Sequence, residues 1–154
     1  MLDHEQLDVY QLQLQFIRWV TALIEDVQQR APGKTAEVRK QLDRASLSVL
    51  LNIAEGNGKR QQQTRAKFFD DARGSASESA ACLDALVAKG VCQMQQMEEG
   101  KQMLRRVIAM LTKLIQRFDS DSSSSSSPSS KHPTTRRRTR TGESESPSVG
   151  GSLR

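Results

Sequence analysis

The side chains that could carry out acid–base or metal chemistry are few and widely spaced in this sequence. The two histidines are His4 and His132, so none lies between residues 5 and 131. Glu55 and Glu78 could serve as carboxylate ligands, but metal sites in helical bundles usually add a histidine three residues after such a glutamate. The pattern therefore predicts no metal, no cofactor and no enzymatic activity.

The two cysteines, Cys82 and Cys92, are too few for a disulfide framework and have no histidine near them in the sequence. Such a count is typical of reduced thiols in a cytosolic protein. We expect them to be buried or half-buried side chains without a catalytic role.

Several polar residues interrupt the helical segments, and we expect them to form a structural polar network. Asn52 and Glu55 are three positions apart, so they share one face near the end of a helix. Polar groups inside a bundle are tolerated when they are hydrogen-bonded, and such networks fix the register of the helices. The predicted network joins Asn52 and Glu55 to Ser75 and Glu78. A small-molecule site at these residues is the alternative.

Basic residues are concentrated in one third of the chain. Residues 30–73 contain ten Lys or Arg against five Asp or Glu. Lysine and arginine contact phosphates and supply affinity that does not depend on base sequence. The candidate RNA or DNA contacts are Arg39, Lys40, Arg44, Lys59, Arg60, Arg65 and Lys67. An ordinary solvated helix face is the alternative for each of them.

The apolar pattern predicts four helices and no strand. Apolar residues recur at spacings of three and four over residues 5–30, 35–57, 64–89 and 93–118. Thr64 is the expected cap of the third helix, and Pro32, Gly33 and Gly90 mark the breaks. Short connections between long helices favour antiparallel neighbours. The expected fold is all-α, an up-down-up-down antiparallel four-helix bundle over residues 1–119.

Two faces of these helices predict close packing. Positions 72, 75, 76, 79 and 80 are all Ala or Ser, a strip that lets two backbones approach, and Gly74 is expected at such a contact. The first helix has an apolar face too wide for a small bundle. The residues left over for an interface between copies are Leu12, Phe16, Trp19 and Leu23.

Residues 120–154 have almost no apolar side chains, so we expect a disordered Ser- and Arg-rich tail. Its cluster of cations within 131–140 could act as an arm on phosphate backbones. The first ten residues lack the pattern of a secretory signal, and no apolar run is long enough to span a membrane. We expect a cytoplasmic protein.

Residues 46–78, SLSVLLNIAEGNGKRQQQTRAKFFDDARGSASE, resemble the signature of the bacterial ribosomal RNA intervening-sequence proteins. In that family a helix ending in N-I-A-E-G precedes a short basic turn, an aromatic helix start and a G-S-x-x-E segment. The corresponding residues here are Asn52 to Gly56, Lys59-Arg60, Phe68-Phe69, Gly74-Ser75 and Glu78. The resemblance covers roughly residues 5–118 and implies a four-helix bundle.

The family also resembles the accessory variability determinant proteins of diversity-generating retroelements. Those bundles assemble as pentamers, bind nucleic acid and partner a reverse transcriptase. The resemblance thus implies a homopentamer that binds RNA or DNA with low sequence specificity, as the accessory subunit of such a reverse transcriptase. The alternatives are a protein-interaction scaffold or an intervening-sequence protein of unassigned role.

Overall fold

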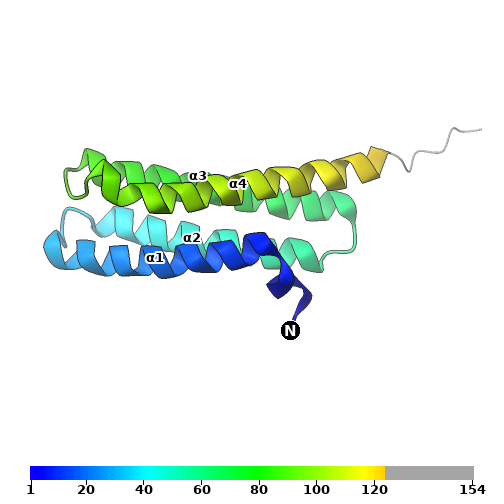
Figure 1. Ribbon diagram of the computed structural model, residues 1–154, viewed down its shortest axis with the longest axis horizontal. Coiled ribbons are helices and arrows are strands. Elements are labelled where there is room, and N and C mark those ends of the chain that lie inside the picture. Colours follow the sequence, from blue (N-terminus) through cyan, green and yellow to red (C-terminus); the bar gives the residue numbers. More distant parts are fainter. Residues whose placement is uncertain (124–154) are drawn as a thin grey trace, which may run out of the picture.

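The computed structural model describes residues 1–123, which form the predicted four-helix bundle (Figure 1). A short 3-10 helix, η1 (Asp3–Gln6), precedes four α-helices. These are α1 (Asp8–Arg30), α2 (Ala36–Gly58), α3 (Gln62–Ala88) and α4 (Met94–Ser123). No strand occurs in this part of the chain.

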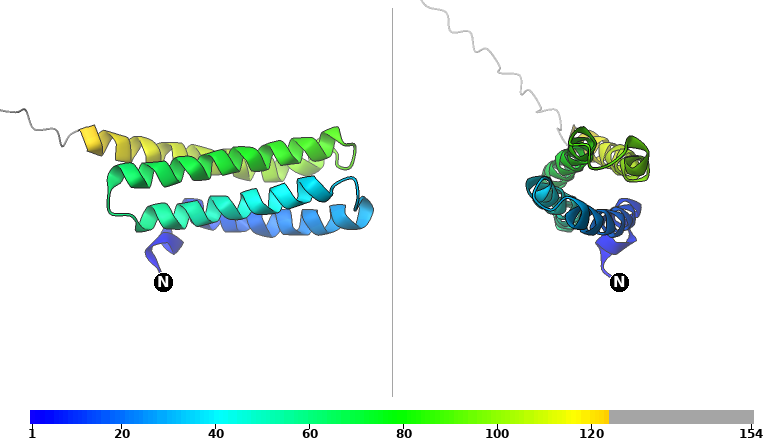
Figure 2. Two further views of the ribbon diagram at one scale, coloured as in Figure 1. Left: turned by 180° about the vertical axis from the view of Figure 1, so that it is seen from behind. Right: turned by 90° about the vertical axis from the view of Figure 1, so that its left-hand side faces the viewer.

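Cross-helix contacts show that neighbouring helices run antiparallel. Between α2 and α3, Arg44 pairs with Glu78 and Ser48 bonds Ser75, so one residue number rises as the other falls. Between α3 and α4, Arg73 reaches Thr112 and Lys101 reaches Asp84, with the same trend. Each helix contacts the next one along the chain, and α4 returns beside α1 (Figure 2).

The helix ends differ from the predicted ones by small amounts that have local causes. The third helix begins at Gln62, because Gln61 takes the N-cap position and Thr64 lies inside the first turn. It ends before Gly90, whose positive φ of 72° favours glycine.

The fourth helix continues to Ser123, past the predicted bundle end at residue 119. Propagating an existing helix costs far less free energy than starting one, so the helix continues for several residues beyond its last apolar side chain. The remainder of the predicted tail, with its cluster of cations, lies outside the described residues.

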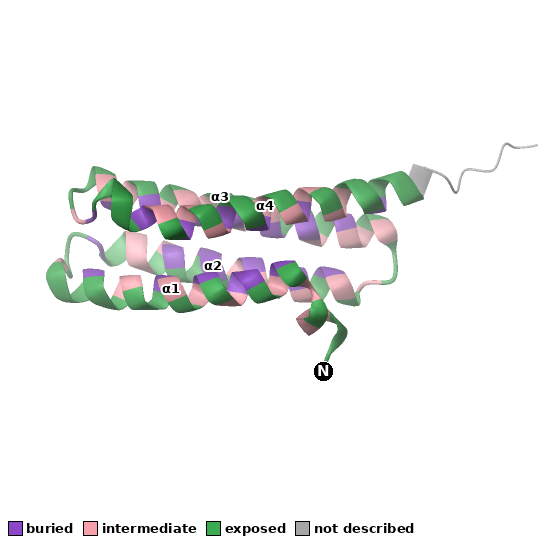
Figure 3. Ribbon diagram, in the orientation of Figure 1, coloured by how far each residue is buried: buried purple, intermediate pink, exposed green. Residues whose placement is uncertain are grey.

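The core consists of aliphatic side chains and three phenylalanine rings, Phe16, Phe69 and Phe118. All four helices contribute buried residues to it (Figure 3). Leu12 is 4 % exposed and Phe16 is fully buried, so both belong to the core of their own chain. The prediction that these two residues are left over for an interface is therefore wrong. Trp19 and Leu23 are half-buried and pack against the same core.

One polar side chain, Gln13, lies in the core and ties α1 to α2. Its Nε2 donates a hydrogen bond to the Ser46 carbonyl oxygen at 2.8 Å. Its Oε1 is buried and has no hydrogen-bond partner among the described residues. A buried polar group tolerates few positions, so this bond favours a single register of α1 against α2.

Small residues let α3 approach both of its neighbours closely. Ala72, Ala76 and Ser79 are fully buried, and the backbone contacts of α3 with α2 and α4 are more extensive than those of α1 with either neighbour. Gly56 of α2 adds to this contact, because a Cβ there would lie 3.0 Å from the Phe68 Cβ. Gly56 in the NIAEGNG segment is thus a packing residue.

The contact between α1 and α4 depends on a different glycine, Gly100. A Cβ at this position would overlap the Trp19 ring, with Cε3 only 2.8 Å away. The Trp19 ring is itself held beside Phe16, with ring centroids 5.8 Å apart. Gly74, which we expected at a close contact, is exposed and has no atom within 4 Å of an added Cβ.

Gly100→Ala should lower the melting temperature, whereas the matched control Gly74→Ala should raise it. Both changes gain up to about 1 kcal/mol of helix propensity. Only the first must displace a packed indole, and overpacking of this kind costs about 1–3 kcal/mol. Thermal unfolding followed by circular dichroism measures both. An equal rise in the two variants would contradict the packing of Trp19 on Gly100.

Candidate nucleic-acid interface

The turn between α2 and α3 places two lysines against one aromatic ring, with an arginine next to one of them in the sequence. The Nζ atoms of Lys59 and Lys67 lie 5.2 Å and 5.6 Å from the centroid of the Phe68 ring. Arg60 is exposed in the turn itself, between the two lysines in sequence. We call Lys59, Arg60, Lys67 and Phe68 the turn cluster. It combines a π-face with positive charge, the two features that single-stranded nucleic acid contacts.

Both lysines of the turn cluster also pair with acids on their own helices. Lys59 Nζ lies 3.0 Å from Glu55, and Lys67 Nζ lies 2.9 Å from Asp71. These are exposed pairs between residues four apart, which contribute only a few tenths of a kcal/mol. A phosphate can therefore replace the carboxylate at little cost.

Arg65 and Arg39 bind backbone carbonyl groups of their own chain. Arg65 donates hydrogen bonds of 2.7 Å to the carbonyl oxygens of Asn57 and Lys59, at the carboxyl end of α2. Its guanidinium also lies 5.2 Å from the Phe118 ring of α4. Arg39 donates to the Pro32 carbonyl oxygen at 2.9 Å. These two residues stabilise the connections on either side of α2.

The remaining two predicted contacts, Lys40 and Arg44, lie elsewhere on α2. Arg44 forms an ion pair with Glu78. Lys40 is exposed and precedes Lys59 by 19 residues, or about 28 Å along the helix. The seven candidate residues thus do not form one patch, and the structure brings only Lys59, Arg60, Arg65 and Lys67 together at the α2–α3 turn.

The predicted polar network is present in part, with different members. Asn52 Nδ2 donates to the Ser48 carbonyl oxygen at 3.0 Å and to Ser48 Oγ at 3.2 Å. Ser48 Oγ lies 3.0 Å from Ser75 Oγ and so links α2 to α3. The side chain of Glu55 is 54 % exposed and bonds Lys59, and Glu78 bonds Arg44, so both glutamates lie outside this network.

Residues on the other face of the bundle were not singled out from the sequence. Arg106, Lys113 and Arg117 lie on one side of α4, bordering hollows between α4 and α1. The signal was present, because residues 100–118 contain no Asp or Glu. Phe68 was noted in the sequence only as part of the family signature and not as a candidate contact, since one aromatic residue next to another is typical of a core.

Among the described residues we looked for side chains that could bind a metal ion or act as a nucleophile. In residues 1–123 no group of three or more His, Cys, Asp and Glu side chains is placed to hold a metal. Burial, and then the charge of Glu78, raise the pKa of the Cys82 thiol. Since the thiolate is the reactive form, a raised pKa makes a poor nucleophile at neutral pH. None of the helices described is apolar over a length sufficient to cross a membrane.

The sequence matches the model of a known protein family. The family model described as 23S rRNA-intervening sequence protein matches residues 5–113, more than two thirds of the chain. No curated protein matches the sequence. The likeness to retroelement accessory proteins stays a prediction.

The membership of the polar network can be measured by double-mutant cycles on the free energy of unfolding. Ser48→Ala and Ser75→Ala should be coupled by about 0.5–1.5 kcal/mol, because each removes one side of the same hydrogen bond. Glu55→Ala and Ser75→Ala should show no coupling, since Glu55 bonds Lys59 instead. Coupling between Glu55 and Ser75 would restore Glu55 to the network.

Proposed function

The chain belongs to the 23S rRNA-intervening sequence protein family, and we propose that it is a non-enzymatic, homo-oligomeric protein that binds nucleic acid with low sequence specificity. The observation that carries the proposal is the turn cluster, in which two lysine Nζ atoms flank the Phe68 ring. Both Nζ atoms lie over the ring in the free protein, so a base would stack on it as the lysines turn from the ring to the neighbouring phosphates, which Arg60 would also contact.

The side chains of the turn cluster favour binding of nucleic acid with little dependence on base sequence. Base-specific contacts need donors and acceptors held in a fixed geometry, as in a recognition helix lying in the major groove. Lysines on flexible stems contact phosphates as point charges instead. The absence of histidine between residues 5 and 131 of the sequence favours a binding protein over an enzyme that uses a histidine as acid or base.

Reversing the three cations, by Lys59→Glu, Arg60→Glu and Lys67→Glu together, should weaken binding of a short single-stranded RNA and reduce its salt dependence. Removing one phosphate contact lowers the slope of log K against log salt by about 0.7, so the slope should fall by about 2. Phe68→Leu should weaken binding with little change in slope, because it removes stacking and keeps the charge. Fluorescence anisotropy at several salt concentrations measures both, on the RNA and on a DNA duplex.

The matched control reverses three exposed lysines at the opposite end of the bundle, Lys34, Lys40 and Lys89. It changes the net charge equally and should retain most of the affinity. Equal reductions of affinity in both triple variants would show a diffuse charge effect and contradict a site at the turn. Wild-type protein without salt-sensitive binding to either ligand would contradict the nucleic-acid proposal altogether.

The proposed oligomer forms through the outer face of α2 and α3. Leu47 and Leu51, one turn apart on α2, are 49 % and 57 % exposed. Ser48 lies against Ser75, so these leucines are level with Gly74, where the α3 backbone is bare. Exposed leucines beside a surface of small residues can interdigitate with the same surface of a second copy. Repeating the turn cluster in each copy would strengthen a weak single site.

Leu47→Glu with Leu51→Glu should convert the oligomer to a monomer of 17.2 kDa. Leucine and glutamate have similar helix propensities, so the fold should persist while two charges oppose each other across the interface. Light scattering of the wild type should give a multiple of this mass. The resemblance to pentameric proteins implies five times the mass of one chain. Met94→Glu is the control, because Met94 is 70 % exposed at the start of α4. A wild-type mass of one chain at micromolar concentration would contradict the proposal.

A further inference from the structure

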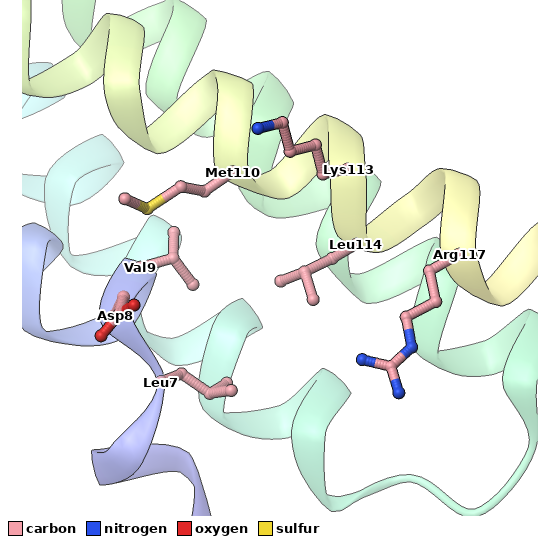
Figure 4. Close-up of a pocket in the computed structure, with 7 residues that line it drawn as sticks. All are labelled: Leu7, Asp8, Val9, Met110, Lys113, Leu114 and Arg117. Carbon is pink, nitrogen blue, oxygen red and sulfur yellow. The ribbon is translucent and has the colours of Figure 1, made fainter.

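The boundary between α1 and α4 contains a groove that the proposed function does not use. One hollow of about 350 Å³ lies between the start of α1 and the last turns of α4 (Figure 4). A second, of about 250 Å³, shares Asp8 and Met110 with the first and extends along the helices to Gln15 and Arg106. Together the two hollows form one open groove, which we call the α1/α4 groove.

The floor of the α1/α4 groove is apolar in the first hollow, whereas the second hollow adds only Leu12 and Met110 among polar side chains. Leu7, Val9, Met110 and Leu114 are directed into the space between the two helices (Figure 4). Leu7, Met110 and Leu114 are only partly buried, so they keep apolar surface available to a ligand. Methionine is flexible enough to adapt to a partner side chain.

The two walls of the groove differ in charge. On the α4 wall, Arg106, Lys113 and Arg117 recur along one face over 11 residues, or about 16 Å. No acid occurs in residues 100–118, so no carboxylate of that segment offsets them. The α1 wall carries Asp8 beside neutral Gln11 and Gln15. A ligand that matches this groove is therefore apolar on one side and negative along one edge.

We propose that the α1/α4 groove binds an amphipathic helix of a partner protein, whose apolar stripe is bordered by Asp or Glu. A length of about 16 Å equals three helical turns. Over that length the partner helix would set its apolar side chains at i, i+4, i+7 and i+11 on the first hollow and on Leu12 and Met110 of the second. The partner's acids then meet Arg106, Lys113 and Arg117. Opposite charges aligned in this way fix the orientation of the bound helix and raise its rate of association.

Two other occupants fit the groove less well. A nucleic-acid strand would contact the cations but leave the apolar floor in water, and no aromatic ring lines the groove for base stacking. A second copy of this chain offers the exposed pair Leu47 and Leu51. Asp43 and Glu55 lie one turn to either side of that pair, but Lys40 and Arg44 lie on the same face of α2, so a second copy presents mixed charge and not an acidic edge to the α4 cations.

The test uses the full chain and a labelled synthetic helix of about 16 residues, with Leu at the four anchor positions and Glu beside them. A control peptide replaces each Glu with Lys. Fluorescence anisotropy should detect the Glu peptide and give at least tenfold weaker binding of the Lys peptide. Lys113→Glu with Arg117→Glu should invert this preference, because both side chains are exposed and their reversal leaves the core intact.

Two variants distinguish this proposal from a failure of the proposed function. Lys34→Glu with Lys89→Glu makes the same charge change outside the groove and should bind the Glu peptide like the wild type. The triple reversal at the turn cluster should also keep peptide binding, whatever it does to RNA binding.

Three results would overturn the proposal. The first is no measurable binding of the Glu peptide at millimolar concentration. The second is displacement of the peptide by RNA together with loss of RNA binding in the Lys113/Arg117 variant, which would make the groove a nucleic-acid surface. The third is a change of oligomeric mass in that variant, which would make it an interface between copies.

Discussion

The close approach of α3 to α2 and α4 is the constraint on which the rest of the bundle depends. It requires small side chains at Ala72, Ala76 and Ser79, together with a bare backbone at Gly56. Three helices held close together leave the fourth to fill the remaining volume. The first helix does so with large side chains, Phe16 and Trp19, so its backbone stands further from its neighbours. The open groove between α1 and α4 follows from that difference in spacing.

The four helices and their order could be predicted because apolar periodicity and Gly or Pro breaks are local signals. The membership of the core was harder to predict for α1. Leu12 and Phe16 looked superfluous when one apolar seam was counted for each helix, yet a helix that stands away from its neighbours needs a wider face. The periodicity of a single helix does not reveal the spacing of the others. The glycines posed the same difficulty. Both Gly74 and Gly100 lie within helical segments of the sequence, but only Gly100 has a side chain, that of Trp19, packed against its backbone.

Charge predicted the candidate site only in part, because arginine serves two purposes in a small bundle. Composition indicated a basic segment, and Lys59 and Lys67 do lie against one ring at the α2–α3 turn, with Arg60 exposed beside Lys59. Arg65 instead satisfies a carbonyl oxygen that the end of α2 leaves without a helical partner, and Arg39 bonds the Pro32 carbonyl oxygen in the turn before α2. Which arginines bond backbone carbonyl oxygens depends on the geometry of the loops, and the number of charges in a segment does not predict that geometry. The lack of Asp and Glu in residues 100–118 of α4 is visible in the sequence. That the cations of this segment border a groove becomes clear only when α1 is placed beside them.

The hydrogen bonds of Arg65 have a consequence for the thermodynamics of recognition. One guanidinium holds two carbonyl oxygens at the end of α2 and lies against Phe118 of α4, so the α2–α3 connection is already ordered in the free protein. A ligand that meets an ordered loop does not have to offset the entropy of arranging it. In the proposed binding of nucleic acid at this turn, the entropy of ordering would then be lost by the ligand and not by the protein. A strand with few intramolecular base pairs would have no pairs to break before its bases stack, which would give it the advantage over a folded one.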